Sequence, residues 1–189
     1  MIDENNPLLK YLDRLAAVPS VTKADAMDTL QTLVREFFRK SRCWRTYARC
    51  NAIGIPGVAF PHGWAAYPLP SHPGRYLGDI LRVNGHQSEH VEIRTMPDAR
   101  RVILVRDGAR HINALCVWEA ERGNEADIPT GLLDRWGDDI AEATRETLSS
   151  RKDRNARGRD FLRDFNIAIA TAAARADRET GINQGYFNG

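Results

Sequence analysis

A stretch rich in proline and glycine in the first half of the chain is the feature that most restricts its fold. Five of the nine prolines and four glycines lie between residues 51 and 74, which contain the run GIPGVAFPHGWAAYPLPSHPG. Proline lacks the backbone N–H that a helix interior or a central strand requires, and glycine weakens both. This density excludes a long helix and predicts turns that join short edge strands.

Two helices are predicted before this stretch. Asn6 followed by Pro7 is typical of a helix start, and leucines recur after it at helical spacing. The second helix is predicted from Ala24 to Arg45, because Thr22 and Asp25 resemble a capping box. Apolar residues also recur there with the helical period, namely Ala26, Met27, Leu30, Leu33, Val34, Phe37, Phe38 and Trp44.

Four strands and two further helices are predicted after it. The strands are RYLGDILRV, EHVEIRT, RRVILVR and INALCVWEA, with Asn84-Gly85 and Asp107-Gly108 as hairpin turn signals between them. Together they predict one small antiparallel sheet between about Trp64 and Glu119. Helical periodicity returns in TGLLDRWGDDIAEATRETLSS and in DFLRDFNIAIATAAARADRET, which Gly181 is expected to end.

The fold class expected from this order is α+β. Each amphipathic helix needs a partner for its apolar face, so the two helical halves should pack together. We predict mainly an α-helical bundle of about four helices, with an inserted small antiparallel β-sheet lobe and an extended C-terminal arm. At 189 residues the chain is expected to be a single domain. Its parts are a helical body (6–48 and 130–180), a β insertion (52–120) and the arm (181–189).

One string matches a metal-binding pattern. HQSEH, residues 86–90, has the H-x-x-E-H form of a class of zinc hydrolases, which need both histidines on one helical face. Here the string follows a turn signal and runs into a predicted strand. On a strand His86 and His90 would lie about 13 Å apart, which is too far to share a zinc ion bound at about 2 Å per ligand. We interpret the string as a solvent-exposed hairpin.

The cysteines indicate no metal site either. Cys43, Cys50 and His62 have the spacing of no common zinc finger, and buried thiols are the commoner case. The chain has three cysteines, Cys43, Cys50 and Cys116, and their irregular spacing argues against a disulfide framework and fits a reducing compartment. Since no P-loop, dinucleotide motif or nucleophile elbow occurs, we expect no enzyme, no catalytic residue, no metal and no cofactor.

The charges are segregated along the chain, although the net charge is only +2. Residues 35–49 hold six basic residues and one acidic, residues 119–146 nine acidic and three basic, and residues 151–163 six basic and two acidic. Three interpretations are open: solvated faces, complementary contacts between copies, or phosphate binding by the last of these segments. The aromatic residues of the first segment favour a core helix whose outer face is basic. No run of 18 apolar residues occurs, so no membrane partner is expected.

Several motifs resemble the head-to-tail adaptor (connector) proteins of tailed bacteriophages. LVREFFRKSRCWR has the form L-x-x-x-F-x-x-x-S-x-x-W-R of a long early helix in that family. AAYPLPS followed by GRYLGDILRVNGH is similar to the segment leading into the family's sheet insertion, and IPTGLLDRWGDDIAEA to the start of its third helix. A terminal helix of the form F-x-x-x-F-x-x-A-x-x-x-A precedes a short tail. The run AEATRETLSS departs from the family by being more polar.

The resemblance implies a structural virion protein of the neck, between capsid and tail, which is in the host cytoplasm during assembly. It implies a dodecameric ring under the portal protein that extends the DNA channel and offers an attachment surface to the next tail or neck protein. The family's C-terminal arm typically reaches the portal; its residues here would be Ile182, Asn183, Gln184, Tyr186 and Phe187. Double-stranded DNA would pass without sequence-specific binding, and the candidate channel-facing residues are Arg151, Lys152, Arg154, Arg157 and Arg159.

Two other hypotheses come from different classes of protein. The basic loop from Arg151 to Arg159 could make the chain a nucleic-acid-binding module, which predicts duplex binding with a steep dependence on salt. The loop lacks interleaved aromatic residues, so it does not resemble a platform for single strands. An H-x-x-E-H metalloenzyme would require stoichiometric zinc, which we do not expect.

Overall fold

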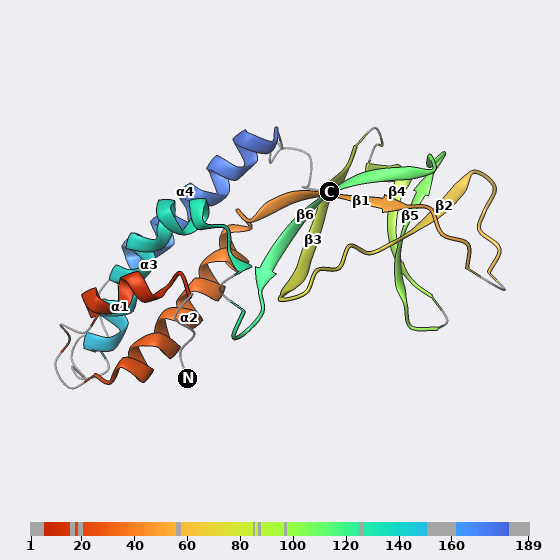
Figure 1. Cartoon of the computed structure of the whole chain (residues 1–189). Helices are drawn as coiled ribbons and strands as arrows, with labels where there is room; N and C mark the ends of the chain where they lie inside the picture. Colours follow the sequence, from red (N-terminus) through yellow and green to blue (C-terminus); the bar gives the residue numbers. More distant parts are fainter. Residues whose placement is uncertain are drawn as a thin grey trace. The chain divides into compact units, whose positions relative to one another are not determined.

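The computed structural model describes residues 6–15, 18, 21–55, 58–84, 86, 88–96, 98–124, 127–150 and 162–181. The chain divides into two compact units (Figure 1). One unit, called here the helical unit, consists of Met1–Trp44 together with Glu119–Gly189. The other, called here the β unit, consists of Arg45–Trp118.

The helical unit contains four helices, taken over the residues that the structure describes. They are α1 (Leu9–Leu15), α2 (Lys23–Ser41), α3 (Thr130–Ser150) and α4 (Arg163–Thr180). Helix α2 packs against both α3 and α4, and α1 packs against α2 and α3 (Figure 1). Segments from the two ends of the sequence therefore share one helical core.

Local capping explains where several helices begin and end. The side chain of Asn6 accepts a hydrogen bond from the backbone N–H of Leu8 at 2.9 Å, just before α1. Thr22 caps α2 by accepting from the backbone N–H of Asp25 at 3.1 Å. Gly181 ends α4 in the left-handed conformation with φ of 64°, which glycine adopts at little cost. These three helix boundaries confirm the sequence prediction.

Phe37 of α2 lies at the centre of the helical core. It is fully buried, and its ring centroid is 5.7 Å from that of Trp136 in α3 and 5.8 Å from that of Phe165 in α4. Such spacings are those of favourable aromatic pairs. The apolar side of α2 is therefore committed to packing, while Arg39 and Lys40 at its last turn are exposed. The interpretation of this segment as a core helix with a basic outer face is confirmed.

The predicted end of this helix is wrong. The prediction extended it to Arg45, but α2 ends at Ser41 because Arg42 adopts the left-handed conformation, with φ of 52°. Its backbone N–H donates to the carbonyl of Phe38 at 3.0 Å, which closes the last turn. Trp44 is nevertheless buried, with its ring centroid 6.2 Å from that of Phe38. An apolar residue at helical spacing is thus buried from a loop rather than from the helix.

In its described residues, the β unit contains two three-stranded sheets. Sheet A has the strand order β1 (Arg45–Asn51), β6 (His111–Ala120) and β3 (Arg75–Val83). Sheet B has the order β2 (Trp64–Pro68), β5 (Arg101–Arg106) and β4 (Val91–Thr95). Strands β1 and β6 are antiparallel over their shared length, as are β5 and its two neighbours.

The β unit has a hydrophobic core of its own. On one face of sheet B, a buried cluster is formed by Ile55, Ala66, Met96, Val102 and Leu104. On the opposite face of the same sheet, Tyr67, Ile103 and Val105 are completely buried. Because successive residues of a strand point to opposite faces, β5 is covered on both sides.

The predicted fold class is therefore corrected. About 44% of the described residues are helical and 29% are in strands, so the chain is α+β but not mainly a helical bundle. The prediction underestimated the β content for two reasons. It predicted no strand at the residues of β1, placing 45–48 in the helical body, and it expected one small sheet where the chain forms two.

The two predicted hairpins are also wrong. The turn signal Asp107-Gly108 lies between β5 and β6, and Asn84-Gly85 lies between β3 and β4, but each pair of strands is divided between the two sheets. Asp107 does have a positive φ of 53°. At Gly108, an added Cβ would lie 3.2 Å from Cζ of Tyr67 and closer still to its hydroxyl. The glycine is thus required by the buried tyrosine rather than by hairpin geometry.

Candidate functional site

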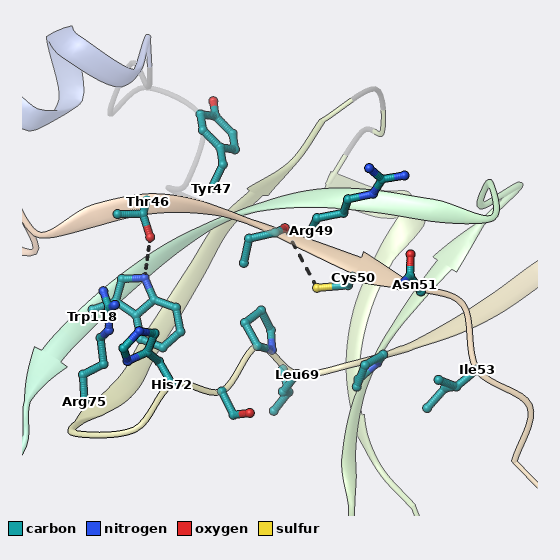
Figure 2. Close-up of a pocket in the computed structure, with 14 residues that line it drawn as sticks. Thr46, Tyr47, Arg49, Cys50, Asn51, Ile53, Leu69, His72, Arg75 and Trp118 are labelled. Atoms are coloured by element: carbon teal, nitrogen blue, oxygen red, sulfur yellow. Dashed lines mark hydrogen bonds between the residues drawn. The ribbon is translucent and has the colours of Figure 1, made fainter.

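A cleft of about 670 Å³ lies in the β unit alongside strand β1 (Figure 2). It is lined by residues 46–51 of β1, by Ile53, by residues 68–72, and by Arg75 and Trp118. This volume falls in the range of about 300–1,000 Å³ that is typical of ligand pockets. The cleft is therefore a candidate binding site.

One wall of the cleft is the outer edge of β1. The backbone N–H of Ala52 donates to the carbonyl of Arg110 at 2.9 Å, which continues the register of β1 with β6. In an antiparallel pair, every second residue turns its backbone groups toward the partner strand. The even-numbered residues of β1 therefore face β6. Tyr47, Arg49 and Asn51 direct their backbone N–H and C=O groups the other way, toward the cleft.

Two prolines explain why no strand formed by the described residues pairs with this edge. Ile53, just after β1, donates its N–H to the carbonyl of Ala66 in β2 at 2.8 Å and forms an antiparallel bridge. Continuing that register would place Pro68 opposite Asn51 and Pro70 opposite Arg49. Proline has no N–H to donate, so the ladder cannot continue past the bridge. The segment then separates from β1 and the cleft opens between them.

Small side chains line the inner face of β1. Thr46 and Cys50 lie on the side of the cleft, whereas Tyr47 and Arg49 extend to the opposite side of the strand (Figure 2). Ala48 lies between Thr46 and Cys50 on their face, because side chains alternate along a strand. We call Thr46, Ala48 and Cys50 the floor of the cleft. Their small volume leaves room for side chains of a ligand.

A cluster of aromatic and basic side chains closes one end of the cleft. The indole N–H of Trp118 donates to the hydroxyl of Thr46 at 2.7 Å. The guanidinium carbon of Arg75 lies 5.1 Å from the centroid of the Trp118 ring, a cation–π distance, and the His72 ring meets the same indole at 6.4 Å. None of the described residues that line the cleft is Asp or Glu. The described lining therefore includes positively charged side chains and no negatively charged ones.

The cysteines near the cleft are buried rather than reactive. Burial raises the pKa of Cys116 to about 12, and the neighbouring Cys50 adds to this rise. Burial also raises the pKa of the Cys50 thiol. Both side chains are therefore neutral thiols at neutral pH, and the thiolate is the nucleophilic form. The three cysteines all lie within the described residues, are buried, and form no disulfide.

These raised pKa values predict a loss of stability at alkaline pH. The unfolded chain releases the Cys116 proton near its usual pKa of 9.0, whereas the folded chain retains it until about 12. Between these values the unfolded state binds fewer protons, so the free energy of unfolding falls as pH rises. We expect the urea midpoint to fall over this interval, and the Cys116→Ala variant to fall less steeply. Parallel pH profiles for the two proteins would contradict the assignment.

The residues predicted to bind the portal or to face DNA cannot be located. The arm residues Ile182, Asn183, Gln184, Tyr186 and Phe187 lie outside the described residues. The same is true of the basic loop residues Arg151, Lys152, Arg154, Arg157 and Arg159. Helix α3 ends at Ser150 and α4 ends at Thr180, so each group directly follows a described helix. Their roles remain predictions.

In the HQSEH string, the three residues SEH form a short turn rather than part of a zinc-binding helix. Residues Ser88–His90 make one 3₁₀ turn, and strand β4 follows at Val91. His90 lies 3.7 Å from the carboxylate of Glu89, and both side chains are substantially exposed. Among the residues that the structure describes, no three His, Cys, Asp or Glu side chains converge on a metal-binding position.

The cleft was not predicted from the sequence. The available signal was the spacing of Pro68 and Pro70, which removes the N–H from every second residue of one segment. That spacing marks a strand edge that cannot pair. It could be recognised only once β1 and the bridge between Ile53 and Ala66 were known.

Within the described ranges, no helix has both the length and the apolar character needed to cross a membrane. Comparison with models of protein families finds no match to this chain, and comparison with curated proteins likewise finds none.

Proposed function

We propose that this chain is a structural head-to-tail adaptor of a tailed bacteriophage, without catalytic activity. In the virion neck it forms a ring under the portal protein and extends the DNA channel. Residues 182–189 bind the portal, and other surfaces of the ring attach the next tail or neck protein. Double-stranded DNA passes through the ring without sequence-specific binding.

The order of the structural elements is the observation that supports this proposal best. Helices α1 and α2 precede the β unit, and α3 and α4 follow it. The helices from the two ends of the sequence pack into one unit, in which Phe37 of α2 contacts Trp136 and Phe165. This is the order of pieces on which the resemblance to the adaptor family rests.

The charges of the helical unit support contacts between copies. Arg39, Lys40 and Arg42 are exposed at the end of α2, whereas α3 exposes Asp134, Asp138, Asp139 and Glu142. A contact between unlike surfaces of successive copies can close into a ring. Several of these charges already have partners within the chain, including Lys40 with Glu36 and Glu142 with Arg145. Replacing an exposed ion pair within one chain by an exposed pair between two copies adds little binding free energy. We therefore expect the copies to be monomeric until the portal assembles them.

The arm is tested by deletion. We expect the full-length protein to be monomeric alone and to form a ring on purified rings of a candidate portal protein, seen by negative-stain microscopy. Deletion of residues 182–189 should abolish this binding while leaving the circular dichroism spectrum unchanged. Retained affinity in the deletion variant would refute the role of the arm. Failure of the full-length protein to bind any portal ring tested would refute the adaptor function.

Binding to DNA distinguishes the alternative function. A nucleic-acid-binding module that uses Arg151 to Arg159 would bind duplex DNA by itself, with a salt slope near −0.9 for each phosphate contact. We expect instead weak binding without sequence preference, because the basic loop would only face the channel. Tight binding with a steep salt slope, in the absence of portal binding, would favour the module.

A further inference from the structure

We propose that the cleft beside β1 binds an extended acidic peptide segment of a partner protein, which adds a strand to the free edge of sheet A. This inference goes beyond the adaptor function and does not depend on it. It rests on the backbone edge of β1, the floor of the cleft, and the charged cluster at its end (Figure 2).

The backbone edge supplies the affinity. Strand β1 is the outer strand of sheet A, and its register with β6 turns the N–H and C=O groups of Tyr47, Arg49 and Asn51 toward the cleft. Within the described part of the chain, no backbone hydrogen bond joins these three residues to a strand on that side. An extended peptide can satisfy such groups by pairing as an additional strand.

The segment that contains Pro68 and Pro70 keeps this edge available to a partner. Pro68 and Pro70 occupy the positions at which the chain's own segment would have to donate N–H groups to β1. That segment therefore cannot occupy the edge itself by ordinary pairing. Proline also fixes its own φ, so this segment loses little conformational entropy when a ligand binds.

The floor and the charged end supply the selectivity. Alternate side chains of an added strand point to one face, where Ala48 and Cys50 leave room for them. At the end near Thr46, Arg75 and His72 pack on the Trp118 indole, and no carboxylate lines the cleft in the described residues. A peptide that carries an acidic side chain at this end is electrostatically complementary to the cleft.

The charge also argues against the chain's own arm as the occupant. Residues 182–189 read INQGYFNG and contain no acidic side chain. An arm from a second copy would therefore bring no side-chain carboxylate to the charged end of the cleft. A synthetic peptide of this sequence is therefore a useful comparison in the binding experiment.

The probes are capped hexapeptides of alternating valine and threonine, with one glutamate at either the amino or the carboxyl end. Matched peptides carry glutamine instead, and one further peptide is N-methylated at alternate residues so that it cannot pair with a strand. We expect fluorescence anisotropy with the full chain to show one glutamate peptide binding at least about five-fold more tightly than its glutamine counterpart. The N-methylated peptide should not bind. Hydrogen exchange should slow at the amides of Tyr47, Arg49 and Asn51.

Two protein variants locate the site. Ala48→Leu fills the floor and should abolish binding of the glutamate peptide. Arg75→Gln should remove the preference for glutamate over glutamine. This preference is the ratio of the affinities for the two peptides, and a general loss of affinity would leave that ratio unchanged. Arg101→Gln, an exposed arginine at the start of β5, is the matched control and should keep the preference.

Several outcomes would overturn the inference. The cleft is not a strand-addition site if neither glutamate peptide binds at millimolar concentration, or if the N-methylated peptide binds equally well. Equal affinity for the glutamate and glutamine peptides would exclude the acidic selectivity. Stronger binding of the INQGYFNG peptide would show that the cleft is a contact between copies rather than a site for an acidic partner.

Discussion

The Phe37→Ala variant is expected to lose about 3–5 kcal/mol of unfolding free energy, which is the usual cost of deleting a buried phenylalanine ring. Phe37 has no exposed surface, and its ring contacts those of Phe38, Trp136 and Phe165. The variant would leave a cavity where α2, α3 and α4 meet. Urea denaturation followed by circular dichroism at 222 nm, where helices dominate the signal, measures the change.

An exposed apolar residue of the same unit provides the control. Ile167 of α4 has 52% of its surface exposed, so Ile167→Ala should change the free energy of unfolding by less than about 0.5 kcal/mol. If the two variants unfold at the same urea concentration, Phe37 is not the centre of the helical core.

The second large effect is expected for Gly137→Ala, which should destabilise the helical unit by about 1–3 kcal/mol although alanine favours helices. Gly137 is buried in the middle of α3, against Tyr11 of α1. An added Cβ would lie 2.9 Å from Cε1 of Tyr11, and closer still to its hydroxyl and Cζ. Tyr11 also donates a hydrogen bond to the carbonyl of Leu133 at 2.8 Å, which the displaced ring would lose. Thermal and urea unfolding of the variant measure the loss.

Another glycine of α3 is the matched control. Gly131 has no atom within 4 Å of an added Cβ, so Gly131→Ala should be neutral or stabilising by less than about 1 kcal/mol. Combining Gly137→Ala with Tyr11→Ala should cost less than the sum of the single changes, because the clash is removed with the ring. Additive losses would show that Tyr11 and Gly137 do not interact.

The parts of the fold that could be predicted are those determined by residues close to one another in the sequence. The caps at Asn6, Thr22 and Gly181 require only a side chain or a glycine within three residues of the helix end. The end of α2 could not be predicted in this way, because Arg42 adopts a left-handed conformation that its residue type does not favour. Apolar spacing continued through Trp44, and periodicity alone does not distinguish a helical turn from a buried loop.

Long-range pairing explains why the cleft was not predicted. Its wall exists because β1 pairs with residues 111–117 and because Ile53 bridges to Ala66. Neither contact has a signal in the residues next to it in the sequence. The assignment of β5 and β6 to different sheets was missed for the same reason, since a local turn does not specify which strand its neighbour will pair with.

The way the chain enters and leaves the β unit has a consequence for how this protein can change. Arg45 is the first residue of the β unit, and Val117 is the last but one. The two are paired as antiparallel neighbours in β1 and β6. Paired residues of this kind have Cα atoms only about 4.5–5.5 Å apart. The whole insertion therefore has adjacent ends, a geometry in which one folded module can be exchanged for another. A chain of this design can acquire a new recognition module in one genetic step and keep its helical scaffold unchanged.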